Sequence, residues 1–191
     1  MGILFGAVLS PSVILTAAIL IARETLAAEA ARPSDSAPDK TIPFEELRKD
    51  AEQGNEKAEY LLGCCYNGDH GFSKDSVEAA KWWERAAAKG LADAQYYLGL
   101  SYYLGQGVPK DATAAAKWWR MAAGQEHAEA QYFLGLSYCA GCGVPKSLAL
   151  TIFWLNKSAE NGDKAALKAL GKLDRRPVDN HSNLEAIHMG R

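Results

Sequence analysis

The sequence predicts an all-α protein: an α/α solenoid of antiparallel helix pairs, with about three full 36-residue repeats and a half-repeat at each end. Three units, 58–93, 94–129 and 130–165, align without a gap. The first two agree at 16 of 36 positions and the last two at 15. Gly63, Gly99, Gly135 and Gly171 keep the same spacing. Repeats of this length are typical of stacked helix pairs that share a continuous core.

The first helix of each unit is predicted from apolar residues at helical spacing. In the second unit these are Ala94, Tyr97, Leu98, Ser101 and Tyr102, which share one face of a helix. A glycine recurs inside this helix, although it costs up to about 1 kcal/mol there relative to alanine. Its recurrence predicts a close approach of two helices that a side chain would block.

The turn and the second helix also have clear signals. The glycines of Gly105-Gln106-Gly107 can end the first helix in a left-handed conformation. Short polar side chains are expected to N-cap the second helices: Asp75, Asp111 and Ser147. Tryptophans at helical spacing are expected in the core: Trp82, Trp118 and Trp154. One unit cannot cover its own aromatic residues, so the units must stack.

The chain divides into four regions. Phe44–Glu52 aligns with a second helix and residues 166–171 with a first helix, so we expect the solenoid to span 43–173. Residues 31–42 are rich in Pro, Ser, Asp and Ala and predict a flexible linker. Residues 174–191 form a polar C-terminal tail.

Residues 1–30 are predicted to be a signal peptide or an N-terminal membrane anchor. The stretch 3–22 carries no charge and is just long enough to span a bilayer as a helix. Ala28-Glu29-Ala30 matches the small-residue pattern of a signal-peptidase site. Against a signal peptide, no Lys or Arg precedes the apolar run. We expect an exported protein, periplasmic or secreted, with two alternatives: an uncleaved tether through 3–22, or a buried segment.

Composition and motifs argue against several functions. A net charge of −2 offers no basic patch for nucleic acid. The four histidines show neither metal-ligand nor catalytic-triad spacing, the acidic residues are scattered, and no nucleophile, zinc-protease or phosphate-loop motif occurs. We therefore expect a non-catalytic protein without cofactor or metal.

The motif Cys139-Ala140-Gly141-Cys142 is the main candidate for chemistry. Redox dithiols of this kind gain a low pKa at a helix N-terminus. Here the repeat places Cys139 in the last turn of a first helix and Cys142 in the turn after it, where the helix dipole disfavours a thiolate. Cys64 and Cys65 lie two repeats away, too far to complete a zinc site. The alternatives left are a local Cys139–Cys142 disulfide in an exported protein or free thiols.

The repeat resembles the Sel-one-like repeat, a relative of the tetratricopeptide repeat. The match runs from Ala94 to Asp111, then Lys117-Trp118-Trp119 and Ala122-Ala123, and recurs over about 130 residues. The chain departs from it in the first loop (67–72) and in the third unit at Ile152-Phe153-Trp154-Leu155. The resemblance implies a cofactor-free solenoid that acts as an adaptor or scaffold. One secreted subfamily joins the helices of each repeat by a disulfide, but the second helices here contain no cysteine, so that subfamily and its suggested β-lactam binding are not supported.

By this resemblance the first helices line a concave face that binds a partner protein or peptide. The expected partner-binding residues are Tyr60, Asn67, Asp93, Tyr96, Leu100, Tyr103, Glu129, Tyr132, Leu136 and Cys139. Tyrosines suit such a surface because they combine contact area with a hydroxyl. Tyr60, Tyr96 and Tyr132 have an alternative role, packing between neighbouring first helices. The alternative function for the whole chain is an envelope enzyme, or enzyme subunit, acting on cell-wall material.

Overall fold

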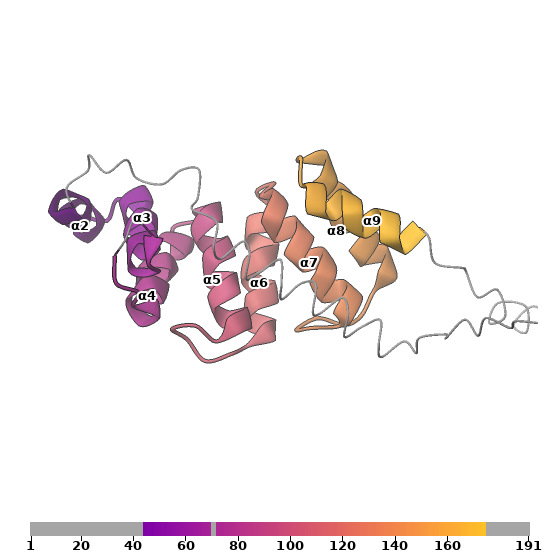
Figure 1. Ribbon diagram of the computed structural model, residues 1–191, viewed down its shortest axis with the longest axis horizontal. Coiled ribbons are helices and arrows are strands. Elements are labelled where there is room, and N and C mark those ends of the chain that lie inside the picture. Colours follow the sequence, from indigo (N-terminus) through magenta and orange to yellow (C-terminus); the bar gives the residue numbers. More distant parts are fainter. Residues whose placement is uncertain (1–43, 70–71, 175–191) are drawn as a thin grey trace, which may run out of the picture.

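The chain forms a single row of helices. The computed structural model describes residues 44–69 and 72–174, and within these ranges it has eight helices and no strand. They are α2 (Phe44–Glu52), α3 (Glu56–Tyr66), α4 (Ser76–Ala88), α5 (Ala92–Leu104), α6 (Ala112–Ala123), α7 (Ala128–Ala140), α8 (Leu148–Glu160) and α9 (Lys164–Asp174). The row is elongated, with α2 at one end and α9 at the other (Figure 1). The predicted all-α solenoid is confirmed.

Three complete pairs, α3–α4, α5–α6 and α7–α8, are flanked by two single helices. Each helix packs against its neighbours in sequence, from α2 on α3 to α8 on α9. The predicted signal peptide or anchor, the linker and nearly all of the polar tail lie outside the described residues. No helix in the described part is long and apolar enough to cross a membrane.

The helix ends follow the sequence signals. Asp75 and Asp111 accept backbone N–H bonds at the starts of α4 and α6, and Ser147 does so at the start of α8. Gly105 and Gly141 end α5 and α7 in the left-handed conformation. In contrast α3 ends at Asn67 in a right-handed conformation, so the altered first loop shortens this helix and changes its exit.

A large side chain of the second helix packs directly onto the recurring glycine of the first helix. A Cβ atom at Gly99 would lie 2.5 Å from Nε1 of Trp119, and one at Gly63 equally close to Trp83. In the third repeat Leu155 replaces the tryptophan, and its Cγ would lie 3.1 Å from a Cβ at Gly135. The predicted close approach is therefore confirmed, and an indole ring is the reason for it in two repeats.

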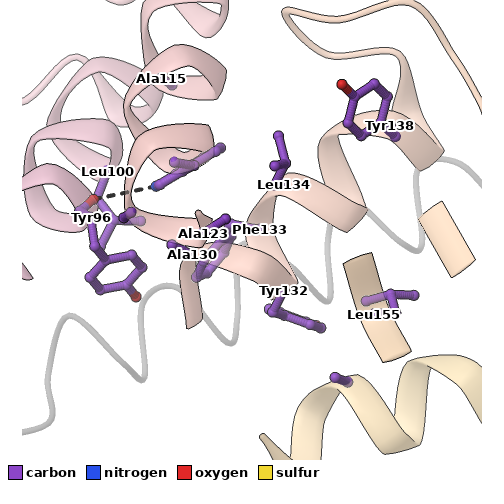
Figure 2. Packing of buried hydrophobic residues seen from close by; sticks show 13 residues of the cluster. Tyr96, Leu100, Ala115, Ala123, Ala130, Tyr132, Phe133, Leu134, Tyr138 and Leu155 are labelled. Atoms are coloured by element: carbon purple, nitrogen blue, oxygen red, sulfur yellow. Dashed lines mark hydrogen bonds between the residues drawn. The ribbon is translucent and has the colours of Figure 1, made fainter. Parts of the chain in front are cut away.

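The core differs from the expectation in which tryptophan it buries. Trp83 and Trp119 are buried, whereas Trp82, Trp118 and Trp154 are half-buried and pack against the edges of core clusters. Periodicity could not separate two adjacent tryptophans, because both fall within a wide apolar stripe. Figure 2 shows the core around Tyr96, Phe133 and Leu134, with the bond that Trp119 Nε1 donates to the Tyr96 carbonyl.

Successive turns are joined by a recurring polar contact, which we call the turn staple. It consists of Glu59 with Lys89, Gln95 with Gln125, and Gln131 with Asn161. The donor of each pair also bonds the backbone carbonyl 35 residues before it, in the turn that precedes the repeat. Glu59, Gln95 and Gln131 are almost fully buried, so each staple satisfies a polar group that would otherwise be buried without a partner.

Candidate partner-binding surface

Four of the predicted partner-binding residues are buried in the core rather than exposed on the surface. Tyr60, Tyr96 and Tyr132 are 8%, 5% and 6% exposed, and Leu100 is also buried. The ring of Tyr60 lies 5.9 Å from that of Tyr97 on the next first helix, and Tyr96 lies 5.9 Å from Phe133 in the same way. This arrangement matches the alternative role for these tyrosines, packing between first helices.

The other predicted residues reach the surface. Asp93 and Glu129 are exposed, and four more are half-buried: Asn67, Tyr103, Leu136 and Cys139. They lie on, or directly follow, α3, α5 and α7. A partner that binds along the first helices would therefore meet two carboxylates, an aromatic ring and a thiol.

A histidine at the start of α7 lies close to both carboxylates. Nε2 of His127 lies 3.4 Å from Asp93 Oδ1, and its Nδ1 lies 3.4 Å from Glu129 Oε2. Nδ1 also accepts the N–H of Ala130 and so caps α7. Because a neutral Nδ1 that accepts this bond cannot also donate one, we place the ring proton on Nε2, where it faces Asp93. His127 is mostly buried, and its ring stacks on Tyr96 at 4.9 Å.

The charge state of Asp93 depends on this histidine. The hydrogen bond from His127 lowers the pKa of Asp93, against the opposing effect of its partial burial. Asp93 therefore presents a negative charge at neutral pH, on an exposed side chain held in place by the next repeat. His127 shows neither metal-ligand nor catalytic-triad spacing, and its contact with Asp93 could not be predicted from spacing alone.

Tyr103 has a different environment from the buried tyrosines. Its ring lies 5.5 Å from Trp119, which supports one side of it, and Lys110 Nζ lies 5.9 Å from the ring centre. The side chain is only half-buried. Tyr103 is thus a positioned aromatic residue at the surface, of the kind that binding sites use.

The four cysteines fall into two groups. Cys64 and Cys65 are buried, and burial raises the pKa of the Cys64 thiol to about 12, so it is a poor nucleophile. Cys139 is in the last turn of α7, and Cys142 follows the left-handed Gly141, as predicted. All four are free thiols in the structure, and a Cys139–Cys142 disulfide stays a prediction. Within 44–69 and 72–174, no group of three or more His, Cys, Asp or Glu residues could hold a metal ion.

Comparison with known proteins gives the family. The Sel1 repeat model matches residues 56–91, 92–127 and 128–163, which is more than half of the chain and coincides with the three helix pairs. The chain belongs to the Sel1 repeat family. Proteins of this family are typically non-catalytic scaffolds for protein interactions. No curated protein sequence matches the chain.

Solved structures of Sel1 repeat proteins have the same fold. A Sel1 repeat protein from Oxalobacter formigenes is 28% identical, with a TM-score of 0.67, over 71% of this chain and 40% of its own. The protein c5321 of uropathogenic Escherichia coli, described as a protective antigen with an SLR fold, is 32% identical, with a TM-score of 0.67, over 83% of this chain and 36% of its own. The chain thus spans well under half the length of these two proteins.

A third structure shows the fold alone. Cysteine-rich protein B of Helicobacter pylori is 21% identical, with a TM-score of 0.54, over 69% of this chain and 99% of its own. Helices α4, α6 and α8 of the present Sel1 repeats contain no cysteine, so a disulfide between the two helices of a repeat cannot form here.

Proposed function

We propose that this Sel1 repeat protein is a non-catalytic adaptor that binds a partner protein or peptide along its first helices. The observation that carries the proposal is the cluster of Asp93, His127 and Glu129 at the starts of α5 and α7. The half-exposed Tyr103 lies near the other end of α5, roughly 15 Å along the helix axis. Two exposed carboxylates and, farther along α5, a supported aromatic ring suit a basic and apolar segment of a partner. The half-buried Asn67, Leu136 and Cys139 would extend this contact along neighbouring repeats.

The buried tyrosines have a supporting role in this proposal. Tyr60, Tyr96 and Tyr132 hold neighbouring first helices at a fixed spacing, and Leu100 packs with them. Substituting them would therefore disturb the fold as well as the surface. Binding is better tested at residues that are exposed.

Pull-downs test the proposal by comparing how much partner protein the parent and its surface variants capture. Asp93→Lys with Glu129→Lys should abolish capture of the partner that the parent protein recovers, and Tyr103→Ala should weaken it. A matched control, Glu84→Lys on the exposed side of α4, should capture the partner normally. Equal capture by the parent and the Asp93/Glu129 variant would overturn the proposal, as would turnover of cell-wall fragments by the purified protein.

We also propose that the protein is exported, with residues 3–22 as a cleaved signal sequence or a membrane tether. The support is the uncharged stretch itself and the following Ala28-Glu29-Ala30. The mass of the native protein's N-terminus tests this. A start near residue 31 indicates cleavage, and an intact N-terminus in the membrane fraction indicates a tether. An intact protein in the cytosol would overturn the proposal.

A further inference from the structure

The start of a second helix is covered by the turn that belongs to the next repeat. Gly107 lies so close to the first residue of α4, and Gly143 to the first residue of α6, that neither position has room for a Cβ. Farther along the same helices, Ala80 and Ala116 are 2% and 1% exposed. Small residues on the helix and glycines in the turn therefore allow this close approach.

The first repeat makes the same contact with larger residues. Phe44 stands 36 residues before Ala80, at the start of α2, and its ring packs on that of Phe72 at 4.8 Å. Phe72 belongs to a link of nine residues, 67–75, between α3 and α4, whereas the turns after α5 and α7 have seven. A longer link that does not begin with a left-handed glycine thus covers the helix start through contacts between side chains.

The third repeat also has large apolar residues at the start of its second helix. Ile152 stands 36 residues after Ala116, and Leu148 precedes it by about one helical turn. Among the described residues alone, these two side chains are 40% and 61% exposed. Because this stretch of α4 and α6 is covered by the chain that follows the next first helix, the expected cover for α8 is the chain that follows α9.

Another large residue of α8 is exposed for a different reason. Phe153 is 49% exposed. Lys81 and Lys117, at the same position of α4 and α6, are exposed although a further helix pair follows each of them. This side of a second helix therefore faces solvent whether or not a repeat follows, and Phe153 can serve as a reference for its neighbour Ile152.

The sequence after α9 has the length and composition of a link rather than of a glycine turn. From the end of α9 to Asn183 there are nine residues, as many as in 67–75. Pro177 stands 36 residues after Gly141, whose φ of +72° a proline ring forbids. Pro177 and Val178 are the apolar residues of this link.

The signals of a second helix follow the link in register. Asn183 stands 36 residues after Ser147, which caps α8, and asparagine is among the best N-cap residues. Ile187 stands 36 residues after Thr151, which is fully buried. The end of the chain thus keeps the cap and an apolar residue at a core position.

We propose that residues 175–191 of the same chain cover the start of α8 and so complete a fourth repeat. Pro177 and Val178 lie over Leu148 and Ile152, as Phe72 packs on Phe44, and Asn183 caps a short helix that holds the segment in place. The segment is within reach because it begins at the end of α9, which packs on α8. The contact uses none of the residues proposed to bind a partner.

The rate of thiol alkylation in the full chain tests this cover. Ile152→Cys and Phe153→Cys each place one thiol on α8, and peptide mass spectrometry separates it from the four native cysteines. Each rate is divided by the rate of the same thiol in urea. We expect the thiol at position 152 to react about tenfold more slowly than the thiol at position 153, because reaction requires the cover to open. The described residues alone leave the two side chains similarly exposed.

Variants of the covering segment provide the matched comparison. Val178→Asp should remove the tenfold difference, because a carboxylate is costly to bury without a partner. Ser182→Asp adds the same charge at a position that is exposed in the three earlier repeats, as Lys74, Lys110 and Lys146, and should leave the difference unchanged.

The protection of position 152 should also be independent of protein concentration, because a contact within one chain does not depend on association. Protection that rises with concentration would mean that a second copy supplies the cover, and would overturn the proposal. So would equal rates at positions 152 and 153 in the chain with the natural segment, or a difference that survives Val178→Asp.

Discussion

The first repeat makes the turn staple with charged side chains, whereas the second and third repeats make the same contact with neutral amides. In the second and third repeats a buried glutamine, Gln95 or Gln131, accepts a bond from the donor of its staple and donates its own N–H to the carbonyl of Ala87 or Ala123. In the first repeat Glu59 stands at the same position and has no N–H to donate. Arg85 performs that role: its guanidinium reaches the Ala51 carbonyl, 36 residues before Ala87.

The substitution of a charge for an amide therefore involves three residues rather than one. Glu59 is fully buried, with Lys89 Nζ 2.7 Å from one carboxylate oxygen and Arg85 Nη2 2.9 Å from the other, the latter close but not aligned as a hydrogen bond. Arg85 and Lys89 remain 46% and 37% exposed. One backbone geometry therefore accepts either a neutral or an ionic contact, and in all three repeats a side chain donates to the carbonyl of Ala51, Ala87 or Ala123.

The largest effect on stability is expected when the ionic turn staple of the first repeat loses Arg85. Arg85→Met removes the guanidinium that bonds the Ala51 carbonyl, which keeps its bond from the Gly54 N–H, and leaves the buried Glu59 with a single cation. We expect the free energy of unfolding to fall by about 3 kcal/mol, measured by urea denaturation. The control is Met121→Ala, at the corresponding exposed position of the second repeat, which should cost well under 1 kcal/mol. A loss below about 1 kcal/mol for Arg85→Met would show that water solvates the Glu59 carboxylate in place of the guanidinium.

The recurring glycine of the first helix allows a second comparison, between Gly99 against Trp119 in the second repeat and Gly135 against Leu155 in the third. Gly99→Ala should cost about 2 kcal/mol, because the new methyl group overlaps the rigid Trp119 ring in a packed core. Gly135→Ala should be close to neutral. Leu155 is farther away and flexible, and alanine gains up to about 1 kcal/mol of helix propensity. Thermal unfolding of both variants gives the difference, and equal losses would contradict a special role for the indole.

An exchange of the whole set tests whether the two staple chemistries are equivalent. The variant Glu59→Gln/Arg85→Met/Lys89→Gln gives the first repeat the residues of the second. We expect its stability to lie within about 1 kcal/mol of the parent, because replacing a complete buried ion pair is often neutral or stabilising. Denaturant unfolding measures it. A loss as large as that of Arg85→Met would mean that the first repeat depends on its charges for another reason.

The helices, their caps and the close approach at the recurring glycines could be predicted from the sequence because these features recur at one spacing. The turn staples could not, because their members lie 30 residues apart and change identity from Glu and Lys to Gln and Asn. Trp118 rather than Trp119 was expected in the core, because adjacent residues share a wide apolar stripe. The burial of Tyr96 depends on Phe133 and His127 from the next repeat, and a pattern within one helix does not show which neighbour covers it.

The smallest effect concerns the contact between the second and third repeats at Asp93. Its pKa is lowered in the folded protein by the hydrogen bond from His127. The ionised carboxylate therefore stabilises the fold at pH values above its pKa in the unfolded chain, about 3.9. This contribution is lost as the pH falls through the lower folded pKa. Because the side chain is 54% exposed, it should amount to less than about 1 kcal/mol.

Thermal unfolding of the parent and Asp93→Asn between pH 6 and pH 2 isolates this contribution. The parent should be slightly more stable at the upper end of the range, and the difference should disappear at the lower end. In a His127→Leu background Asp93 loses the N–H donor that is the main cause of its lowered pKa, so the difference should be small throughout. A difference that grows as the pH falls would contradict the contact, since it would mean that folding favours the protonated carboxyl. Asp93 and His127 are part of the proposed binding surface, so this measurement also reports whether Asp93 is held in place before a partner arrives.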